Sequence, residues 1–247
     1  MCRRMQKNGS LIKTDDRYNN LSSFLPSTLK TNPLLIINIK HKIMKRKLFL
    51  FGSALAIIFT ACTKKNNNGI QLQAHDQNRM MDSMHAMMDR MMAMTKTNDP
   101  EIDFVKMMMM HHQGAIDMSN VELESGTNDS LKLTAQKIIT EQQAEIQQFN
   151  TILATLSVDN SDPDFSMEQM DNMMKGGKTA DIQLITGNID NDFATLMIIH
   201  HQGAIDNASA YLHQGNNAQL KTMATNIVKS QTMEIEEMSN WLIANKR

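Results

Sequence analysis

The chain repeats one segment of its own sequence, and this repeat constrains the fold more than any other feature. The residues His-His-Gln-Gly-Ala-Ile-Asp occupy 111–117 and occur again at 200–206. The same offset, 89 residues from His111 to His200, continues without a gap as far as Leu242. A repeated unit of this size cannot bury its apolar face alone, so the two copies are expected to pack against each other.

Each copy predicts two helices joined by a short turn. In the first copy, apolar residues recur at helical spacing over 101–125, and Gly126 is expected to end this helix in the left-handed conformation. A polar N-cap residue and a second periodic stretch follow. The copies at 101–156 and 190–245 therefore predict an all-α, four-helix bundle within 101–247, made of two repeated helical hairpins.

Composition agrees with helices packed on helices. Only 4% of the residues are aromatic, whereas methionine occurs 24 times. Flexible thioethers suit the interior of a helical bundle, while strands favour β-branched and aromatic side chains. Between the two copies, residues 157–188 contain Asp162-Pro163 and Gly176-Gly177, and they predict a short helix that carries several more methionines.

The N-terminal part predicts export and lipid attachment. Three basic residues precede an uncharged run from Leu48 to Ala61, which is too short for a comfortable membrane span and is typical of a signal peptide over 44–61. Cys62 directly follows small residues, a pattern that resembles a bacterial lipobox with lipid on the cysteine thiol. An ordinary signal with an incidental cysteine is the alternative. Residues 1–43 are interpreted as a start-site artefact or a disordered stretch.

Charge is divided unequally along the chain. Of the 25 basic and 26 acidic residues, 1–61 hold 11 basic and two acidic ones, which leaves 14 basic and 24 acidic residues in 62–247. Such an acidic part is not suited to nucleic acid, because phosphate backbones need a basic face.

We expect a protein held in the cell envelope by its lipid alone, at the outer membrane and facing the periplasm, with a metal ion as partner.

A methionine-rich run precedes the first copy. Residues 62–100 are interpreted as a tether, and within it methionines at helical spacing face nearly all round. These methionines form two stripes along the helix. Core packing explains one stripe, whereas capture of Cu(I) or Ag(I) by thioethers explains both. Sequence drift and a partner-binding surface are the alternatives. The candidate ligands in this segment are Met81, Met84, His85, Met87, Met88 and Met91.

The repeated motif supplies the other candidate ligands. Both copies place two histidines and a methionine within about one turn of helix, which is a donor set for copper. The alternative is structural: a buried histidine needs a hydrogen-bond partner, and the neighbouring helix offers Gln142 and Glu145. The candidate ligands are His111, His112 and Met108, their equivalents His200, His201 and Met197, and, in the first copy alone, Met107 and Met118. Residues expected to orient them are Asp117, Asp206, Gln142, Glu145, Gln231 and Glu234.

The paired His-His-x-Gly-Ala-Ile-Asp segments, each followed by a Gln-x-x-Glu-Ile helix, resemble the domain-of-unknown-function 305 family over about residues 101–245. The resemblance implies a ferritin-like bundle and export, and some members resemble periplasmic copper-binding and copper-tolerance proteins. The family name itself specifies no activity. Copper, as Cu(I), is therefore the expected cofactor.

Enzyme signals are weak. Ferritin-like di-metal oxidases use Glu-x-x-His pairs, whereas the second helices here carry Gln-x-x-Glu and the histidines lie on the first helices. The sequence predicts a non-enzymatic exported lipoprotein that binds Cu(I), and by the same logic Ag(I), for copper tolerance or for transfer to a periplasmic partner. The alternative is a non-catalytic envelope interaction protein, and a weaker one is a di-metal oxidase.

Overall fold

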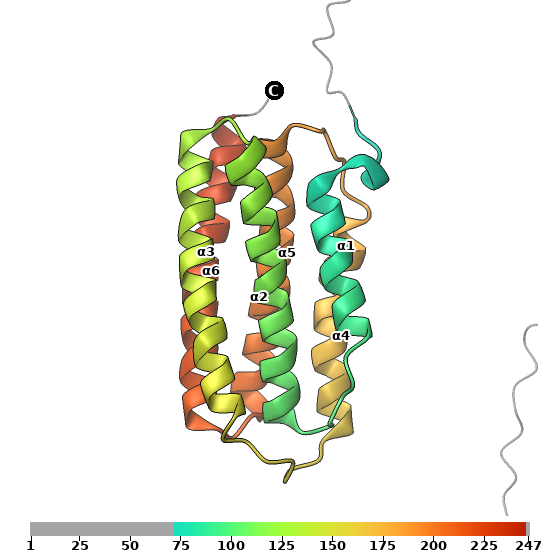
Figure 1. Cartoon of the computed structure of the whole chain (residues 1–247), viewed down its shortest axis with the longest axis vertical. Helices are drawn as coiled ribbons and strands as arrows, with labels where there is room; N and C mark the ends of the chain where they lie inside the picture. Colours follow the sequence, from blue (N-terminus) through green and yellow to red (C-terminus); the bar gives the residue numbers. More distant parts are fainter. Residues whose placement is uncertain (1–71, 246–247) are drawn as a thin grey trace, which may run out of the picture. The chain divides into compact units, whose positions relative to one another are not determined.

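The structure is a computed structural model that describes residues 72–245 (Figure 1). The predicted start-site artefact, signal peptide and Cys62 lie outside the described residues. Within 72–245 the fold is all-α, as predicted, with no strand. A short 3-10 helix, His75–Gln77, precedes the helices α1 (Arg79–Met92), α2 (Pro100–Ser125), α3 (Asp129–Leu153), α4 (Pro163–Ala180), α5 (Ile189–Gln214) and α6 (Ala218–Ala244).

The six helices form three side-by-side pairs. Helices α2 and α3 make one hairpin and α5 and α6 the other, and α2 packs against α5 across the repeat. Helices α1 and α4 contact each other and cover the side of α2 and α5 that faces away from α3 and α6 (Figure 1). The four predicted helices are therefore present, and two further helices complete the core.

The first repeat has three helices and not two. Carried back along the chain, the offset of 89 residues between His111 and His200 relates α1 to α4, with Met81 matching Met170 and Met84 matching Met173. The loops that follow match as well. The Asp103 carboxylate accepts hydrogen bonds from Thr97, and the equivalent Asp192 carboxylate accepts them from Thr186.

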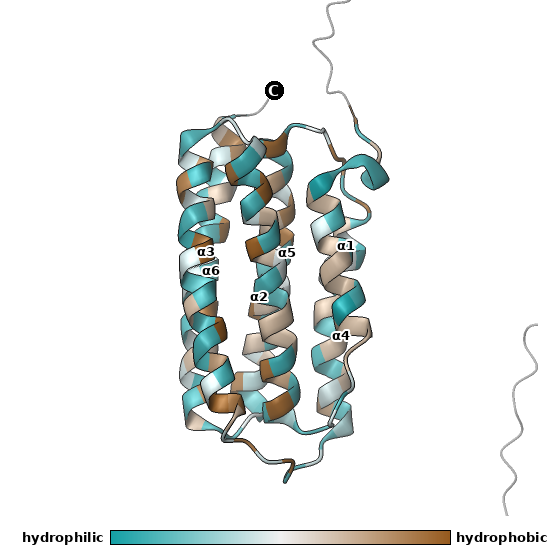
Figure 2. Cartoon of the chain, in the orientation of Figure 1, coloured by the Kyte–Doolittle hydropathy of each residue, from teal (hydrophilic) through white to brown (hydrophobic). Residues whose placement is uncertain are grey.

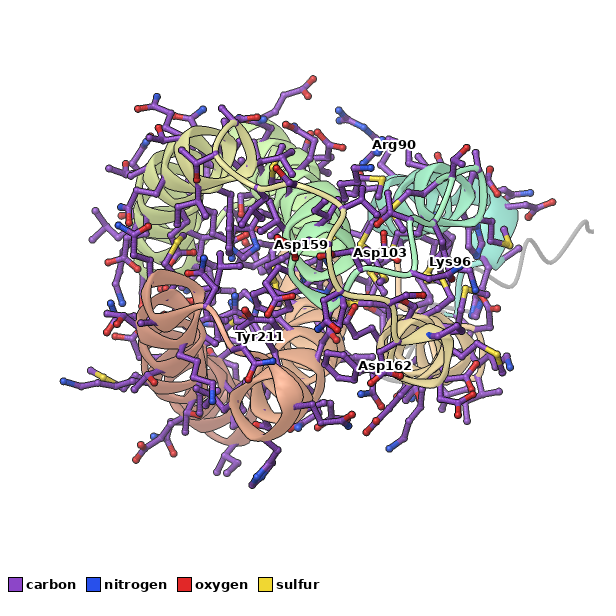
Figure 3. All side chains as sticks on the ribbon, turned by 90° about the horizontal axis from the view of Figure 1, so that it is seen from below. Arg90, Lys96, Asp103, Asp159, Asp162 and Tyr211 are labelled. Atoms are coloured by element: carbon purple, nitrogen blue, oxygen red, sulfur yellow. The ribbon has the colours of Figure 1, made fainter. Side chains whose placement is uncertain are left out.

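Each of these two carboxylates, in the first turn of α2 or α5, also ties the two repeats together. The Ser166 hydroxyl of α4 donates to Asp103 at 2.9 Å, and the Asn78 amide before α1 donates to Asp192 at 2.9 Å. Figure 3, which views the molecule along the helices, shows Asp103 and Asp162 at one end of the bundle. These bonds link α4 to α2 and the start of α1 to α5, so each outer helix is also tied to the other repeat.

The interpretation of residues up to 100 as a tether is wrong for α1. This helix begins after Asn78, whose side chain accepts from the backbone N–H groups of Met80 and Met81. Six of its methionines are buried, whereas His85 and Met92 are exposed. Methionine faces nearly all round because α2, α4 and α5 each contact α1, so several of its faces are buried. The buried methionines of α1 are Met80, Met81, Met84, Met87, Met88 and Met91.

Three glycines show how tightly the helices pack. Gly177 lies inside α4. A glycine is needed there because a Cβ would come within 2.8 Å of the Met88 sulfur. Gly126 and Gly215 end α2 and α5 as expected, but their φ angles are −66° and −67°, so neither is left-handed. They are glycines because the side chains of Glu122 and Tyr211 fold over them and leave no room for a Cβ.

Polar and apolar residues alternate along all the helices, so none is uniformly hydrophobic (Figure 2). Accordingly, no helix within residues 72–245 combines the length and apolar character that crossing a membrane requires. The interior is lined by methionine, and the helices α2 and α5 at its centre bury both histidines of each motif.

Candidate metal centre

The first histidines of the two motifs meet at the centre of the molecule. His111 of α2 and His200 of α5 are buried, and their ring centroids are 3.6 Å apart with an angle of 40° between the planes. One turn further along, a Cβ on Gly114 would lie 3.1 Å from His200 Nε2, and a Cβ on Gly203 would lie 3.6 Å from His111 Nε2. The His-x-x-Gly spacing thus lets each imidazole lie over the glycine of the opposite helix.

These two imidazoles are neutral, and three of their four ring nitrogens lack hydrogen-bond partners within the described part of the chain. Among the described residues, nothing bonds Nδ1 of His111 or either ring nitrogen of His200. Burial lowers the pKa of both groups well below the ordinary value, and the neighbouring histidines lower it further. Buried polar nitrogens are normally paired. A neutral imidazole with a free lone pair is the form that binds metals.

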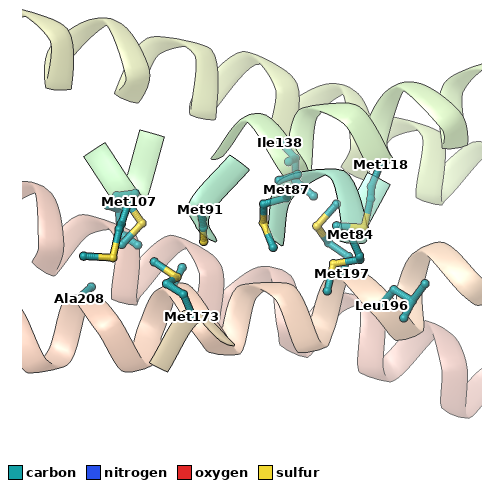
Figure 4. Packing of buried hydrophobic residues seen from close by; sticks show 14 of the residues in the cluster. Met84, Met87, Met91, Met107, Met118, Ile138, Met173, Leu196, Met197 and Ala208 are labelled. Atoms are coloured by element: carbon teal, nitrogen blue, oxygen red, sulfur yellow. The ribbon is translucent and has the colours of Figure 1, made fainter. Parts of the chain in front are cut away.

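Methionine sulfur lies beside this pair. The Met87 sulfur of α1 would be 2.8 Å from the same Gly114 Cβ position that His200 Nε2 approaches, so sulfur and imidazole nitrogen are neighbours. Figure 4 shows further methionines in the same core, with Met84, Met118 and Met197 gathered in one part of the view. The centre of the molecule therefore offers nitrogen and thioether donors from α1, α2 and α5.

The second histidines of the motifs point elsewhere. His112 Nε2 lies 2.7 Å from a carboxylate oxygen of Glu145 on α3, and His201 Nε2 lies 2.9 Å from one of Glu234 on α6. The predicted neighbours are therefore correct. Within residues 72–245, however, neither contact has hydrogen-bond geometry, and all four ring nitrogens stay unpartnered. His112 and His201 therefore face α3 and α6, although the sequence placed both histidines of a repeat in one site, and the His201 ring centroid stays 6.1 Å from that of His200.

Two predicted orienting residues do not touch a histidine. Asp117 accepts hydrogen bonds from Gln113 at 2.9 Å and from Arg90 at 3.1 Å, at the edge of α2. Asp206 accepts from Gln202 at 2.7 Å in the equivalent place on α5. Both are partly exposed, and among residues 72–245 neither forms a hydrogen bond or an ion pair with a histidine.

The remaining candidates divide by burial. Met107, Met108 and Met197 are fully buried. Gln142 and Gln231 are buried on α3 and α6, and no hydrogen-bond partner for their amide atoms exists among residues 72–245. His85 instead lies at the surface, where it contacts Asp181 at 2.8 Å.

Sequence reasoning missed two features of this centre. The contact between α1 and the motif glycine was hidden, because the α1 methionines were interpreted as a tether. The pairing of first histidines across the repeat was also missed, although the His-x-x-Gly spacing on both helices could have indicated it. In the described part of the chain, no three His, Cys, Asp or Glu side chains are placed to hold a metal ion together. A centre here therefore depends on thioether or amide donors.

Two overlapping matches to the family described as "Domain of unknown function (DUF305)" cover residues 60–153 and 101–242. The chain belongs to the DUF305 family. The predicted family is thus confirmed, and the two matches reflect the internal repeat. No curated protein matches the chain.

Solved structures of similar proteins include CopM and a putative secreted DUF305 protein. CopM in an Ag-bound form is 28% identical, covering 60% of this chain and 97% of CopM, with a TM-score of 0.47. CopM in the Cu(I)-bound form is 27% identical over 60% of this chain and 98% of CopM, with a TM-score of 0.45. A DUF305 protein from Streptomyces coelicolor is 22% identical over 60% of this chain and 95% of its own, with a TM-score of 0.48.

Proposed function

We propose that the protein binds a soft monovalent metal, Cu(I) in the first place, at the centre formed by His111, His200 and Met87. The observation that carries the proposal is the pair of buried, neutral imidazoles beside a thioether, with three of their four ring nitrogens unpartnered among residues 72–245. Imidazole accepts copper in either oxidation state, and thioether sulfur selects Cu(I) and its congener Ag(I). Leaving such nitrogens unpaired costs stability, which a bound metal would recover.

The surroundings favour a soft ion over a hard one. Buried methionines from α1, α2 and α5 line the centre, while the carboxylates of Glu145 on α3 and Glu234 on α6 contact the other histidines. Hard cations such as Mg²⁺ prefer oxygen donors, which this centre lacks. The proposed role is capture of the ion for copper tolerance or for handover to a periplasmic partner, and it includes no catalysis.

The test is an anaerobic Cu(I) titration of the whole protein in competition with a chromophoric chelator. His111→Asn with His200→Asn removes the imidazole pair, and Met87→Leu removes one sulfur at similar volume. The matched controls are His213→Asn and Met92→Leu, which change an exposed residue of the same type. We expect the apparent Kd to rise at least tenfold in the first two proteins only. Equal affinity in all five proteins would refute this centre.

Export and lipid attachment at Cys62 are part of the same proposal. The signal-peptide pattern before Cys62 and the acidic character of 62–247 support a location in the cell envelope. Cys62→Ser is expected to abolish incorporation of labelled fatty acid and to release the protein from the membrane fraction. Retention of label in the variant would overturn the assignment.

A second candidate, a non-catalytic envelope interaction protein, is favoured by one observation. Six α1 methionines fill the space between α1 and its neighbours, as packing residues do. Absence of any Cu(I) binding in the titration would select this function over metal capture.

A further inference from the structure

The two repeats each hold a second histidine against a glutamate, and these pairs adjoin the copper centre but face α3 and α6. His112 with Glu145 and His201 with Glu234 are equivalent pairs, and each brings an imidazole nitrogen within 2.9 Å of a carboxylate oxygen. Both histidine side chains are 0% exposed, and neither contact has hydrogen-bond geometry within the described residues. Nitrogen and oxygen are thus brought together without satisfying each other.

A third polar group belongs to each pair. Gln142 lies one turn before Glu145 on α3, and Gln231 lies one turn before Glu234 on α6, so each amide shares a helix face with its glutamate. Both amides are buried, and for residues 72–245 neither their oxygen nor their nitrogen has a partner. Each repeat therefore places an imidazole, a carboxylate and an amide on facing helices with unused donor capacity.

A single lysine makes the two pairs different. Lys137 Nζ lies 3.4 Å from Glu234, whose side chain is 2% exposed, so an ammonium group accompanies this buried carboxylate. The equivalent residue in the second repeat is Asn226, and among the described residues no Lys or Arg forms an ion pair with Glu145. The Glu145 side chain is 19% exposed, which leaves this pair reachable from solvent. A carboxylate in such surroundings calls for a cation.

We propose that His112, Glu145 and Gln142 form a second metal site, which takes a borderline divalent cation of the Zn(II) class. Neutral imidazole nitrogen and carboxylate oxygen are ordinary Zn(II) ligands, and an amide oxygen with solvent water completes the shell. Tetrahedral ligands with bonds of about 2.1 Å lie about 3.3 Å apart, so the 2.7 Å contact has to open by roughly half an ångström. In the second repeat Lys137 supplies the positive charge, so His201 and Glu234 bind no metal.

The site differs from the copper centre in having a carboxylate and no thioether. Zn(II) held by the imidazoles of His111 and His200 would be common to all the variants below, so a comparison of the variants tests this site independently of that function. Thioethers do not retain Zn(II) or Co(II) in competition with nitrogen and oxygen ligands. Titration of the whole protein with Zn(II), followed by calorimetry, counts the sites. Co(II) reports their geometry through its visible absorption.

Three single variants test the proposal. Glu145→Gln is expected to remove one equivalent of tightly bound Zn(II), together with the tetrahedral Co(II) bands. Glu234→Gln is the matched control and keeps that equivalent. Lys137→Met is expected to add a second equivalent of bound Zn(II), because it removes the ammonium group from Glu234 and leaves His201 and Glu234 free to bind a cation. Lys137 is 40% exposed on α3, so the fold tolerates the change.

Two results would overturn the proposal. One is equal Zn(II) stoichiometry in the unaltered protein and in Glu145→Gln, with both proteins shown to be helical by circular dichroism. The other is an unchanged stoichiometry in Lys137→Met, which would show that the lysine does not close the second pair. Zinc held by exposed histidines such as His85 is common to all the proteins and cancels in the comparison. Failure of the Cu(I) titration leaves these outcomes unaffected.

Discussion

At the residue scale, the two motif glycines are equivalent in sequence but not in space. A Cβ on Gly114 would lie 2.8 Å from the Met87 sulfur and 3.1 Å from His200 Nε2, whereas the nearest contact of a Cβ on Gly203 is 3.6 Å. The first distance forces atoms to move, and the second is an ordinary van der Waals contact. The difference arises because α1 carries Met87 where the equivalent residue of α4 is Gly176.

Gly114→Ala is therefore expected to lower the free energy of unfolding by about 1–3 kcal/mol, because it overpacks the core. It should also weaken Cu(I) binding by displacing Met87. Gly203→Ala should be neutral or stabilising by up to about 1 kcal/mol, because alanine favours helix over glycine. Urea denaturation of both variants measures the difference. Equal destabilisation would contradict the asymmetry.

A buried glutamate gives a second prediction at this scale. Burial, together with the neighbouring Asp190, raises the pKa of Glu122 from the ordinary value of 4.5 to about 8. Because the folded-state pKa is the higher one, Glu122 stabilises the fold fully below pH 4.5, and this contribution is lost as pH rises through 8. The second repeat has no buried carboxyl at this position. The equivalent residue is Tyr211, whose hydroxyl is 3.5 Å from Glu101.

Glu122→Gln keeps the shape and removes the ionisation. The melting temperature of the unaltered protein is expected to fall between pH 5 and pH 9 by more than that of the variant. The comparison of the two slopes cancels the titration of other groups. Identical slopes would show that Glu122 ionises freely in the folded protein.

At the element scale, α1 depends on contacts with the second repeat. Its N-cap residue Asn78 accepts from two backbone N–H groups of α1 and also donates to the buried carboxylate of Asp192. Asn217 caps α6 in the same way, and its side-chain bonds go to the α6 backbone. A cap alone is worth about 1 kcal/mol, and a hydrogen bond to a charged group about 1.5–3 kcal/mol.

Asn78→Ala should consequently destabilise the protein by about 2–4 kcal/mol, and Asn217→Ala by about 1 kcal/mol. Hydrogen exchange should show the loss of protection in α1 first, since this helix is released from α5. Losses of equal size in the two variants would mean that the Asn78–Asp192 bond contributes nothing.

The helices of the two motifs could be predicted from sequence because periodicity, caps and repeat all agree for them. Asp99 before Pro100 is an example: its carboxylate accepts from the first backbone N–H groups of α2, as its position indicated. Helix α1 was missed because periodicity records which faces are apolar and not how many neighbours cover them. The match of Met81-Asp82-x-Met84 to Met170-Asp171-x-Met173 was the available signal, but it is short, and the residues on either side of it differ.

The candidate centre was predictable in its chemistry and not in its partners. The motif sequence indicated His111 and His200 as ligands, yet only the crossing of α2 and α5 decides that they stack while His112 and His201 face α3 and α6. Such pairings depend on helix rotation by a fraction of a turn, which side-chain spacing on one helix does not specify.

At the scale of the whole molecule, the repeats complement each other and do not duplicate each other. The N–H of Asn216 donates to Glu101 and the N–H of Thr127 donates to Asp190, so each repeat secures the turn of the other. Where α1 crosses α4, Met88 fills the space above Gly177. Met88 and Gly177 are equivalent positions of the two repeats. A pair of first repeats would therefore place one Met88 against another, and a pair of second repeats would leave a gap between two glycines.

This complementarity predicts how fragments behave. Residues 72–156 and 157–245, expressed apart, should each show little helix by circular dichroism and no stable dimer, because neither copy can bury its apolar face against itself. Mixed, they should form a 1:1 helical complex, measurable by light scattering after size-exclusion chromatography. Gly177→Met in the second fragment should weaken the complex at least tenfold, since it removes the space for Met88. A stable homodimer of either fragment would show that the repeats are interchangeable, and that the methionine and glycine at this crossing do not determine the pairing.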